Sequence, residues 1–334
     1  MDEPSAKAEK ITSRWSWRKR LAFGAVTLLL FVVLVETVLQ LARTAMRPDV
    51  AVDGRISDCD GIVFLAIGDS MTYGLGAPQG QSYPAQLPPF FSARYPGVAA
   101  KAYNLGIPGS NTSEGLLRLR KFIDEEAELS APDYALVMYG VNNRWNLRKA
   151  SFWEFDTKAR DDNYLRYLVS QLQLNKVFSV TAQHGEAAAD MKYRPILDRH
   201  GWGVFFKDYN DELLARWISY DLKVMASVLR GSGIEPVFLT YYQERFGGLN
   251  PLLRRIGAAV GVRVVDMERP TLYYRWRGLY ATDNFHLNGK GYKDAARRAM
   301  EAFSRQVPRR EIDKRLAAKK RGAVCSTGKG GNRR

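Results

Sequence analysis

The sequence predicts an α/β fold in which helices cover both faces of a central parallel sheet. Two observations carry this prediction. Short apolar runs bounded by polar turns alternate along the chain with longer segments whose apolar residues recur at helical spacing. In addition, 46% of the residues are hydrophobic and 12% are aromatic, which is ample for a packed core. An alternating order of strands and helices favours a parallel sheet with its ligand site at the carboxyl ends of the strands.

The first predicted element is a helix that crosses a membrane. Residues 21–42 contain Glu36 as their only ionisable side chain, and at about 1.5 Å per residue they span a hydrocarbon core of about 30 Å. Residues 1–20, with 6 basic and 3 acidic side chains, precede this run. The positive-inside rule therefore places them in the cytoplasm and the rest of the chain outside the cytoplasmic membrane, in a periplasmic or extracellular position. The alternative is a cleaved signal peptide, although the run is long for one and lacks a convincing A-x-A site.

Residues 43–61 are predicted as a linker and residues 62–308 as one α/β domain. Five apolar runs of this domain are predicted as buried strands, at residues 62–67, 98–104, 134–139, 236–241 and 262–266. Longer segments with helical spacing alternate with these runs along the chain, at residues 84–95, 112–129, 212–229, 249–260 and 290–305. Together they give the alternation that a parallel sheet requires.

Residues 143–211 separate the third and fourth predicted strands by more than a simple crossover needs. They are predicted as an inserted helical subdomain or lid. Between residues 145 and 220 aromatic side chains are more frequent than in the chain as a whole. These rings form either a sugar-stacking or acyl-binding cover, or simply the core of the inserted helices. His184 and His200 also lie in this insertion and are rival catalytic bases in principle.

Residues 309–334 mix Lys, Arg and Gly with few apolar side chains, so they are predicted as a basic, disordered tail. This tail either lies on anionic lipid or acidic polymers or is a solvated end. Much of the net charge of +15 sits in the two ends of the chain. The middle is therefore close to neutral, and nucleic-acid binding is not expected.

Cysteine and histidine are scarce. Two Cys, three His and no CxxC motif exclude a disulfide-built scaffold and zinc-finger arrays. Pairing of Cys59 with Cys325 in an oxidising compartment stays open. Neither a metal ion nor another cofactor is expected.

The first predicted strand runs directly into Gly68-Asp69-Ser70. This places a hydroxyl on the turn between a strand and a helix, where helix N–H groups face a developing oxyanion. An ordinary turn with an N-cap would have the same sequence. The partners favour catalysis, because polar residues also follow other strands.

Three further motifs lie just beyond predicted strands. Gly106 follows the second strand and can bring a bare backbone N–H close to a substrate. Asn142 follows the third strand and can donate through its amide. Past the fifth strand, Asp283 precedes His286 by three residues. A His so placed can face Ser70 while the carboxylate orients the ring and stabilises its protonated form.

With these four motifs in this order, the chain resembles the SGNH hydrolase family, also called GDSL-type esterases, over about residues 62–304. The motifs are Gly68-Asp69-Ser70 with Thr72 and Gly74, Asn104 with Gly106, Gly140 with Asn142, and Asp283 with His286. The resemblance implies a flavodoxin-like three-layer α/β/α sandwich without a cofactor. It implies Ser70 as nucleophile, His286 as general base and Asp283 as the partner of His286. It also implies an oxyanion hole built from the Ser70 N–H, the Gly106 N–H and the Asn142 side chain.

Five residues beside these motifs are predicted to contact the substrate, namely Asp69, Asn143, Arg144, Trp145 and Phe285. Trp145 and Arg144 should lie near the mouth of the site, and Phe285 either lines the pocket or packs under the catalytic turn. Position 143 departs from the family, which commonly has Asp after the Asn of the third motif.

These features predict a membrane-anchored serine esterase that hydrolyses or transfers an acyl group. Its first candidate substrates are O-acetyl esters of envelope polysaccharide, because the anchor holds the site near such polymers. Lysophospholipids or thioesters are second, since the same anchor keeps the enzyme beside lipid. The alternative from another class is a non-catalytic envelope protein that uses the cleft for binding or assembly. The oligomeric state stays open.

Overall fold

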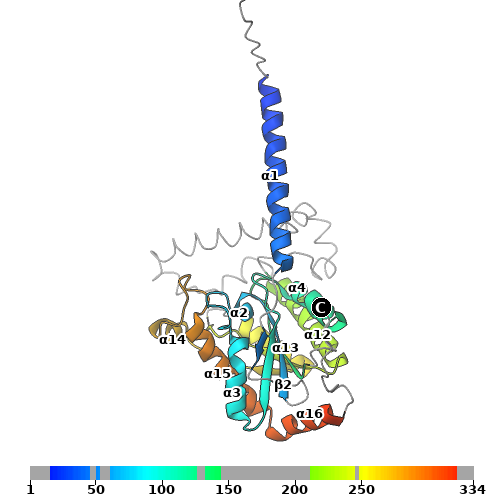
Figure 1. Ribbon diagram of the computed structural model, residues 1–334, viewed down its shortest axis with the longest axis vertical. Coiled ribbons are helices and arrows are strands. Elements are labelled where there is room, and N and C mark those ends of the chain that lie inside the picture. Colours follow the sequence, from blue (N-terminus) through cyan, green and yellow to red (C-terminus); the bar gives the residue numbers. More distant parts are fainter. Residues whose placement is uncertain are drawn as a thin grey trace, which may run out of the picture. The chain divides into compact units, whose positions relative to one another are not determined.

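A computed structural model describes residues 16–45, 50–52, 61–125, 132–143, 211–244 and 248–321 (Figure 1). The chain divides into two compact units, Met1–Met46 and Arg47–Arg334. The predicted insertion at 143–211 lies outside the described residues except for its two ends. Arg144, Trp145, His184 and His200 lie outside them too, as do both cysteines.

The first unit contains one long helix, α1 (Trp17–Ala45), which includes the predicted span 21–42. Within it, the most apolar window of 18 residues in the stretch 17–39 has a mean hydropathy of 2.4, and none of that window is buried. Thr27 and Thr37 donate their hydroxyls to backbone carbonyls four residues earlier, at 2.8 Å each, so these polar groups are satisfied inside the helix. In length and composition α1 fits a membrane-crossing helix or an N-terminal signal sequence equally.

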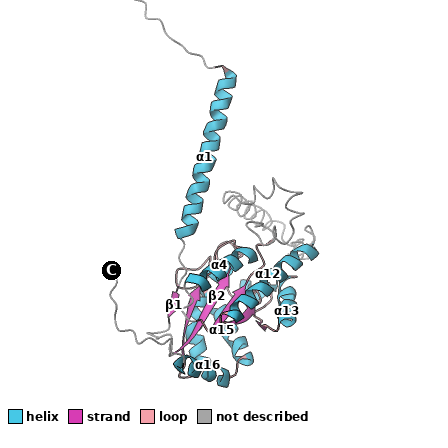
Figure 2. Ribbon diagram, turned by 90° about the vertical axis from the view of Figure 1, so that its right-hand side faces the viewer, coloured by secondary structure: helices cyan, strands magenta, loops and turns pink. Residues whose placement is uncertain are grey.

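The second unit is built on a six-stranded sheet with the order β1-β3-β2-β4-β5-β6 (Figure 2). The strands are β1 (Val50–Val52), β2 (Gly61–Gly68), β3 (Ala99–Asn104), β4 (Tyr134–Met138), β5 (Glu235–Leu239) and β6 (Arg263–Val265). Only β1, at the edge, is antiparallel; the other five are parallel. Their order is the 2-1-3-4-5 order of flavodoxin-like sheets, in which ligands bind where the order reverses. Here that point lies between the carboxyl ends of β2 and β4.

Helices pack against this sheet in two groups (Figure 1). One group consists of α3 (Tyr83–Arg94) and α15 (Gly289–Gln306), and the other of α4 (Thr112–Glu125), α12 (Asp211–Gly231) and α13 (Leu249–Val260). Three further helices are α2 (Ser70–Tyr73), α14 (Thr271–Trp276) and α16 (Arg309–Arg321). Helices on both sides explain why the central strands are buried throughout, as the near-continuous apolar runs predicted.

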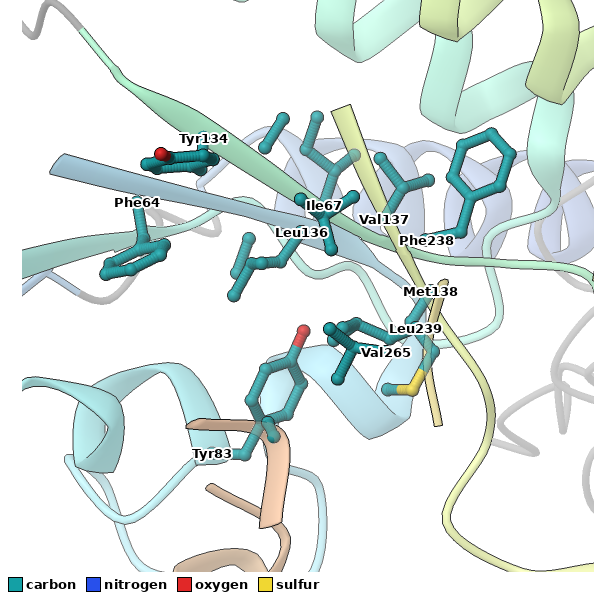
Figure 3. Close-up of a cluster of buried hydrophobic side chains, with 14 of the residues drawn as sticks. Phe64, Ile67, Tyr83, Tyr134, Leu136, Val137, Met138, Phe238, Leu239 and Val265 are labelled. Atoms are coloured by element: carbon teal, nitrogen blue, oxygen red, sulfur yellow. The ribbon is translucent and has the colours of Figure 1, made fainter. Parts of the chain in front are cut away.

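Aromatic rings from three other elements pack around Phe64 of β2, and Figure 3 shows one of them, Tyr134, beside Phe64. The ring of Phe64 meets Phe91 of α3 and Phe303 of α15 edge to face, with centroids 5.3 and 5.6 Å apart, and stacks on Tyr134 of β4 at 5.9 Å. Offset and edge-to-face pairs of this kind each add about 0.5–1.5 kcal/mol beyond burial. They fix α3 and α15 to the sheet.

Each predicted strand and helix of the domain is present, with ends within two residues wherever the structure describes them. The prediction of a disordered tail over residues 309–334 is wrong for residues 309–321, which form α16. Ile312 of this helix is fully buried. Lys319 donates to the carboxylate of Asp133 at 2.5 Å, a largely buried pair. The basic residues that suggested a solvated tail thus include one with a specific partner in the domain. The linker prediction for 43–61 also missed β1.

Candidate active site

The turn that carries Ser70 is shaped by its neighbours. A Cβ on Gly68, the last residue of β2, would lie 1.9 Å from Oγ1 of Thr72, so only glycine fits there. Asp69 then caps α2, because its Oδ1 accepts the N–H of Met71 at 2.9 Å. Ser70 consequently stands at the first position of α2, at the carboxyl end of a central strand.

Ser70, His286 and Asp283 form a hydrogen-bonded line. Oγ of Ser70 lies 2.9 Å from Nε2 of His286, and Nδ1 of His286 lies 2.5 Å from Oδ2 of Asp283. A proton on Nδ1, held by the carboxylate, leaves Nε2 free to accept the serine proton. The structure therefore brings together the three residues that the sequence proposed as a triad.

Asp283 is held as a carboxylate. Partial burial acts to raise its pKa, but the hydrogen bond and charge of His286 oppose this effect. Its Oδ1 also accepts the backbone N–H groups of Phe285 and His286, at 2.9 Å each. The net result lowers the pKa of Asp283 to about 2. This carboxylate is thus ionised at any pH where a histidine base works.

Hydrogen bonds of Asn288 hold the loop that presents His286. Asn288 donates to the carbonyls of Gly278 and Tyr280 at 2.8 and 3.0 Å, while its Oδ1 caps α15. Within the turn Asn284 has a φ of 53°, a left-handed conformation that Asn tolerates better than most residues. These contacts fix the imidazole relative to Ser70.

The two other predicted oxyanion donors are engaged within the protein. The N–H of Gly106 donates to Oδ1 of Asn104 at 2.8 Å, and Nδ2 of Asn142 donates to the carbonyl of Ser110 at 3.1 Å. The N–H of Ser70, at the start of α2, has no acceptor in the described part of the chain. A substrate oxyanion would therefore find one uncommitted donor and would compete for the other two.

Gly106 has a steric role that its sequence position did not reveal. A Cβ there would lie 2.2 Å from the backbone N of Tyr73 and 2.7 Å from the carbonyl carbon of Thr72. The side chain of Asn104 spans the same contact, donating to the carbonyl of Thr72 at 2.9 Å. The turn after β3 therefore rests directly on the backbone of α2.

Two residues predicted to contact substrate do not lie where a substrate can reach them. Asp69 is fully buried, and Tyr241 donates to its Oδ2 at 2.5 Å. Burial raises the pKa of Asp69 to about 7, although its hydrogen bonds oppose the change. Asn143 is fully buried too and bonds to Thr112. Both residues support the site from behind.

Phe285 is partly buried and meets the ring of His286 edge to face, with centroids 4.9 Å apart. This contact with His286 is compatible with either predicted placement of Phe285, so its contact with substrate stays a prediction. Sequence reasoning missed Tyr241, which also accepts the N–H of Val141 at 3.3 Å. Tyr241 thereby links the Ser70 turn to the turn after β4. Nothing in its local sequence signals this, because it follows β5, far from both motifs.

Among the described residues, no group of three His, Cys, Asp or Glu side chains could hold a metal ion. The chemistry that the arrangement offers is proton transfer from a serine to a histidine beside helix and loop N–H groups, which suits acyl transfer from esters.

The model of the GDSL-like Lipase/Acylhydrolase family matches residues 66–293, more than half of the chain. No curated protein matches the sequence. Similar solved structures include the acetylxylan esterase Axe2 from Geobacillus stearothermophilus, with 16% identity over 75% of this chain and 96% of that one and a TM-score of 0.42. A lipase/acylhydrolase from Enterococcus faecalis has 14% identity over 73% and 96% of the two chains, with a TM-score of 0.41. The family match, which spans all four motifs, shows that this chain belongs to the GDSL-like lipase/acylhydrolase (SGNH hydrolase) family of serine hydrolases acting on esters.

Proposed function

We propose that this protein is a membrane-anchored serine esterase that removes O-acetyl groups from envelope polysaccharide, with α1 as the anchor and the domain outside the cytoplasmic membrane. The observation that carries the catalytic part is the line from Ser70 Oγ through His286 to Asp283, at 2.9 and 2.5 Å. The apolar run of α1 and the basic residues that precede this run support the location.

In the proposed mechanism, Oγ of Ser70 attacks the ester carbonyl carbon while Nε2 of His286 takes the serine proton. Asp283 stabilises the imidazolium that forms. The carbonyl oxygen becomes an oxyanion that accepts hydrogen bonds from the Ser70 N–H and the Asn142 amide, with the Gly106 N–H as a third donor.

Collapse of this intermediate breaks the bond to the alcohol oxygen, which receives its proton from His286. Water, deprotonated by His286, then attacks the acyl-serine, releasing the carboxylic acid and restoring Ser70. A sugar hydroxyl in place of water would make the same chemistry an acyl transfer.

A second candidate substrate class is lysophospholipids or thioesters. It is favoured by α1 itself, because a helix that crosses the membrane keeps the domain beside lipid as well as beside envelope polymers.

The test is hydrolysis of p-nitrophenyl esters, from acetyl to long acyl, by the detergent-solubilised full chain. Ser70→Ala should lose turnover by at least about 10³-fold, since the nucleophile is gone. Ser232→Ala is the matched control, because its hydroxyl is exposed and donates to the carbonyl of Val228, four residues earlier. Activity confined to acyl chains of eight carbons or more would contradict the polysaccharide proposal. A folded wild type that hydrolyses no ester would favour a selective transferase or a binding protein.

A further inference from the structure

Beneath the turn that carries Asn142, a chain of buried side chains joins three elements that are distant in sequence. Asn143 follows β4, Thr112 and Ser113 open α4, and Asp221 lies in the middle of α12. All four side chains belong to residues that are at most 1% exposed. The catalytic line described above does not include any of them.

The direction of each hydrogen bond between these four side chains is fixed. The backbone N–H of Thr112 donates to Oδ1 of Asn143 at 3.1 Å, which sets the orientation of the Asn143 amide. Its Nδ2 must then be the group that donates to Oγ1 of Thr112, at 2.6 Å. The hydroxyl proton of Thr112 in turn goes to Oδ2 of Asp221, at 2.5 Å.

A second arm ends on the same oxygen. Ser113 donates its hydroxyl to Oδ2 of Asp221 at 2.7 Å and accepts the indole N–H of Trp217 at 2.9 Å. Two consecutive hydroxyls thus connect the first turn of α4 to one buried carboxylate of α12. Bonds from hydroxyls to a buried charge are among the stronger ones in proteins.

This assembly supports the predicted oxyanion donor. Asn142 is the chain neighbour of Asn143, and its Nδ2 donates to the carbonyl of Ser110, two residues before Thr112. The turn is closed by the Asn143 N–H, which donates to the carbonyl of Gly140 at 3.2 Å. A shift of Thr112 or Asn143 therefore moves the Asn142 amide, and displacements of about 1 Å matter for catalysis.

We propose that Asp221 is a positioning residue for ester hydrolysis, which acts through Thr112 and Asn143 to hold the Asn142 amide where the oxyanion forms. This inference rests on the proposed role of Asn142. It also explains why position 143 carries an amide. The Thr112 hydroxyl has one proton, so an Asp at 143 would set a second carboxylate oxygen against Oγ1 of Thr112, and only one of these two oxygens could accept that proton.

The proposal predicts that exchanging the amide at position 143 with the carboxylate at position 221 preserves activity. Asn143→Asp replaces the amide that donates to the Thr112 hydroxyl with a second acceptor. Asp221→Asn places an amide where the hydroxyls of Thr112 and Ser113 donate to a carboxylate. Each change alone should therefore lower kcat at least about tenfold. In the double variant the hydrogen bonds through Thr112 run in reverse, because the amide at 221 donates to Thr112 and the Thr112 proton goes to the carboxylate at 143. The Ser113 hydroxyl still loses its carboxylate acceptor, but Ser113 lies outside the proposed route from Asp221 to Asn142. The kcat of the double variant should return to within about threefold of the wild type.

The experiment measures kcat, KM and the thermal midpoint of the full chain in detergent with p-nitrophenyl acetate. The variants are N143D, D221N, their combination and, as the matched control, Asp124→Asn on the exposed part of α4. The single variants should lose kcat with KM within about threefold, and the control should match the wild type. Two results would overturn the proposal. One is that the single variants, assayed below their thermal midpoints, keep the kcat of the wild type. The other is that the kcat of the double variant is no higher than that of the less active single variant.

A second cycle tests the route through Asn142. In an Asn142→Ala background, D221N should lower kcat no further, whereas a purely structural role would lower it by the same factor as before. Labelling of Ser70 by a fluorophosphonate separates the two proposals. If the wild type labels but does not turn over esters, the proposed function fails, and slower labelling of D221N with recovery in the double variant still supports the role of Asp221.

Discussion

Asp283 shows how a single residue prepares the base. Its carboxylate accepts from Nδ1 of His286 at 2.5 Å and from two backbone N–H groups. Asp283→Asn keeps the shape but no longer favours the tautomer in which Nε2 accepts the serine proton. We expect kcat to fall about 10³- to 10⁴-fold with little change in KM. The matched control is Asp313→Asn, an exposed carboxylate paired with Arg309; equal losses in both variants would contradict a catalytic role for Asp283.

Asp69 makes a prediction about stability. Its pKa of about 7 in the folded state exceeds the unfolded value of 3.8, so between about pH 4 and 7 the folded protein binds a proton that the unfolded chain has lost. The free energy of unfolding therefore falls as the pH rises through this window and levels off above it. Asp69→Asn lacks this dependence.

Unfolding of both proteins in urea at pH 5 and pH 8 measures the effect. Relative to Asp69→Asn, the wild type should lose on the order of 2–4 kcal/mol of unfolding free energy between the two pH values. Parallel pH profiles would mean that Asp69 is ionised throughout.

Gly106 predicts a steric effect. Because a Cβ would lie 2.2 Å from the backbone of Tyr73, Gly106→Ala must push the turn after β3 away from α2. The expected cost is about 1–3 kcal/mol of unfolding free energy, with at least a tenfold drop in kcat as Ser70 shifts. Gly231→Ala, where nothing lies within 4 Å of the added Cβ, should change neither quantity. A fully active Gly106→Ala would show that the contact has room to relax.

At the scale of elements, α16 closes the amino-terminal edge of the sheet. Lys319 donates to the carbonyl of Gly61, where β2 begins, and to Asp133, where β4 begins. Desolvation raises the pKa of Asp133 and lowers that of Lys319, while their mutual attraction opposes both changes. The pair therefore depends on both partners being present.

Removal of Lys319 leaves a buried carboxylate without this partner. Lys319→Ala should lower the unfolding free energy by about 3 kcal/mol, which thermal unfolding detects, while kcat stays unchanged because the pair is at the opposite edge from Ser70. Lys320→Ala, one residue on and exposed, should leave the midpoint in place. Cutting the chain after Pro308 should destabilise it at least as much; a stable truncated domain would contradict this view of α16.

Some elements of this fold can be predicted from the sequence and others cannot. Strands such as β2 and β4 could be predicted because burial on both faces demands an unbroken apolar run. The helix α16 could not, since its mean composition is polar and its placement depends on ion pairs such as Arg263 with Glu311, 48 residues apart. The triad was predictable because Ser70 directly follows β2 and because Asp283 and His286 stand three residues apart just before α15. The directions of Asp69 and Asn143 were not, because adjacency to a catalytic residue does not fix which way a side chain points.

At the scale of the whole molecule, an apolar helix precedes a hydrolase domain, and the charge is concentrated at the chain ends. We expect an anchored protein with its domain outside, because Arg18, Lys19 and Arg20 stand before the apolar run at residues 21–42, whose 22 residues reach about 33 Å. Alkaline phosphatase fused after Arg334 should be active, and exchange of Arg18, Lys19 and Arg20 for Glu should weaken that signal.

An epitope placed at the N-terminus distinguishes an anchor from a signal peptide. If the epitope stays on the full-length protein, and the protein stays with the membranes during carbonate extraction, α1 is retained. A mature protein shortened by about 42 residues and found in the soluble fraction would mean that α1 is removed, and the substrate would then have to be sought away from the membrane surface.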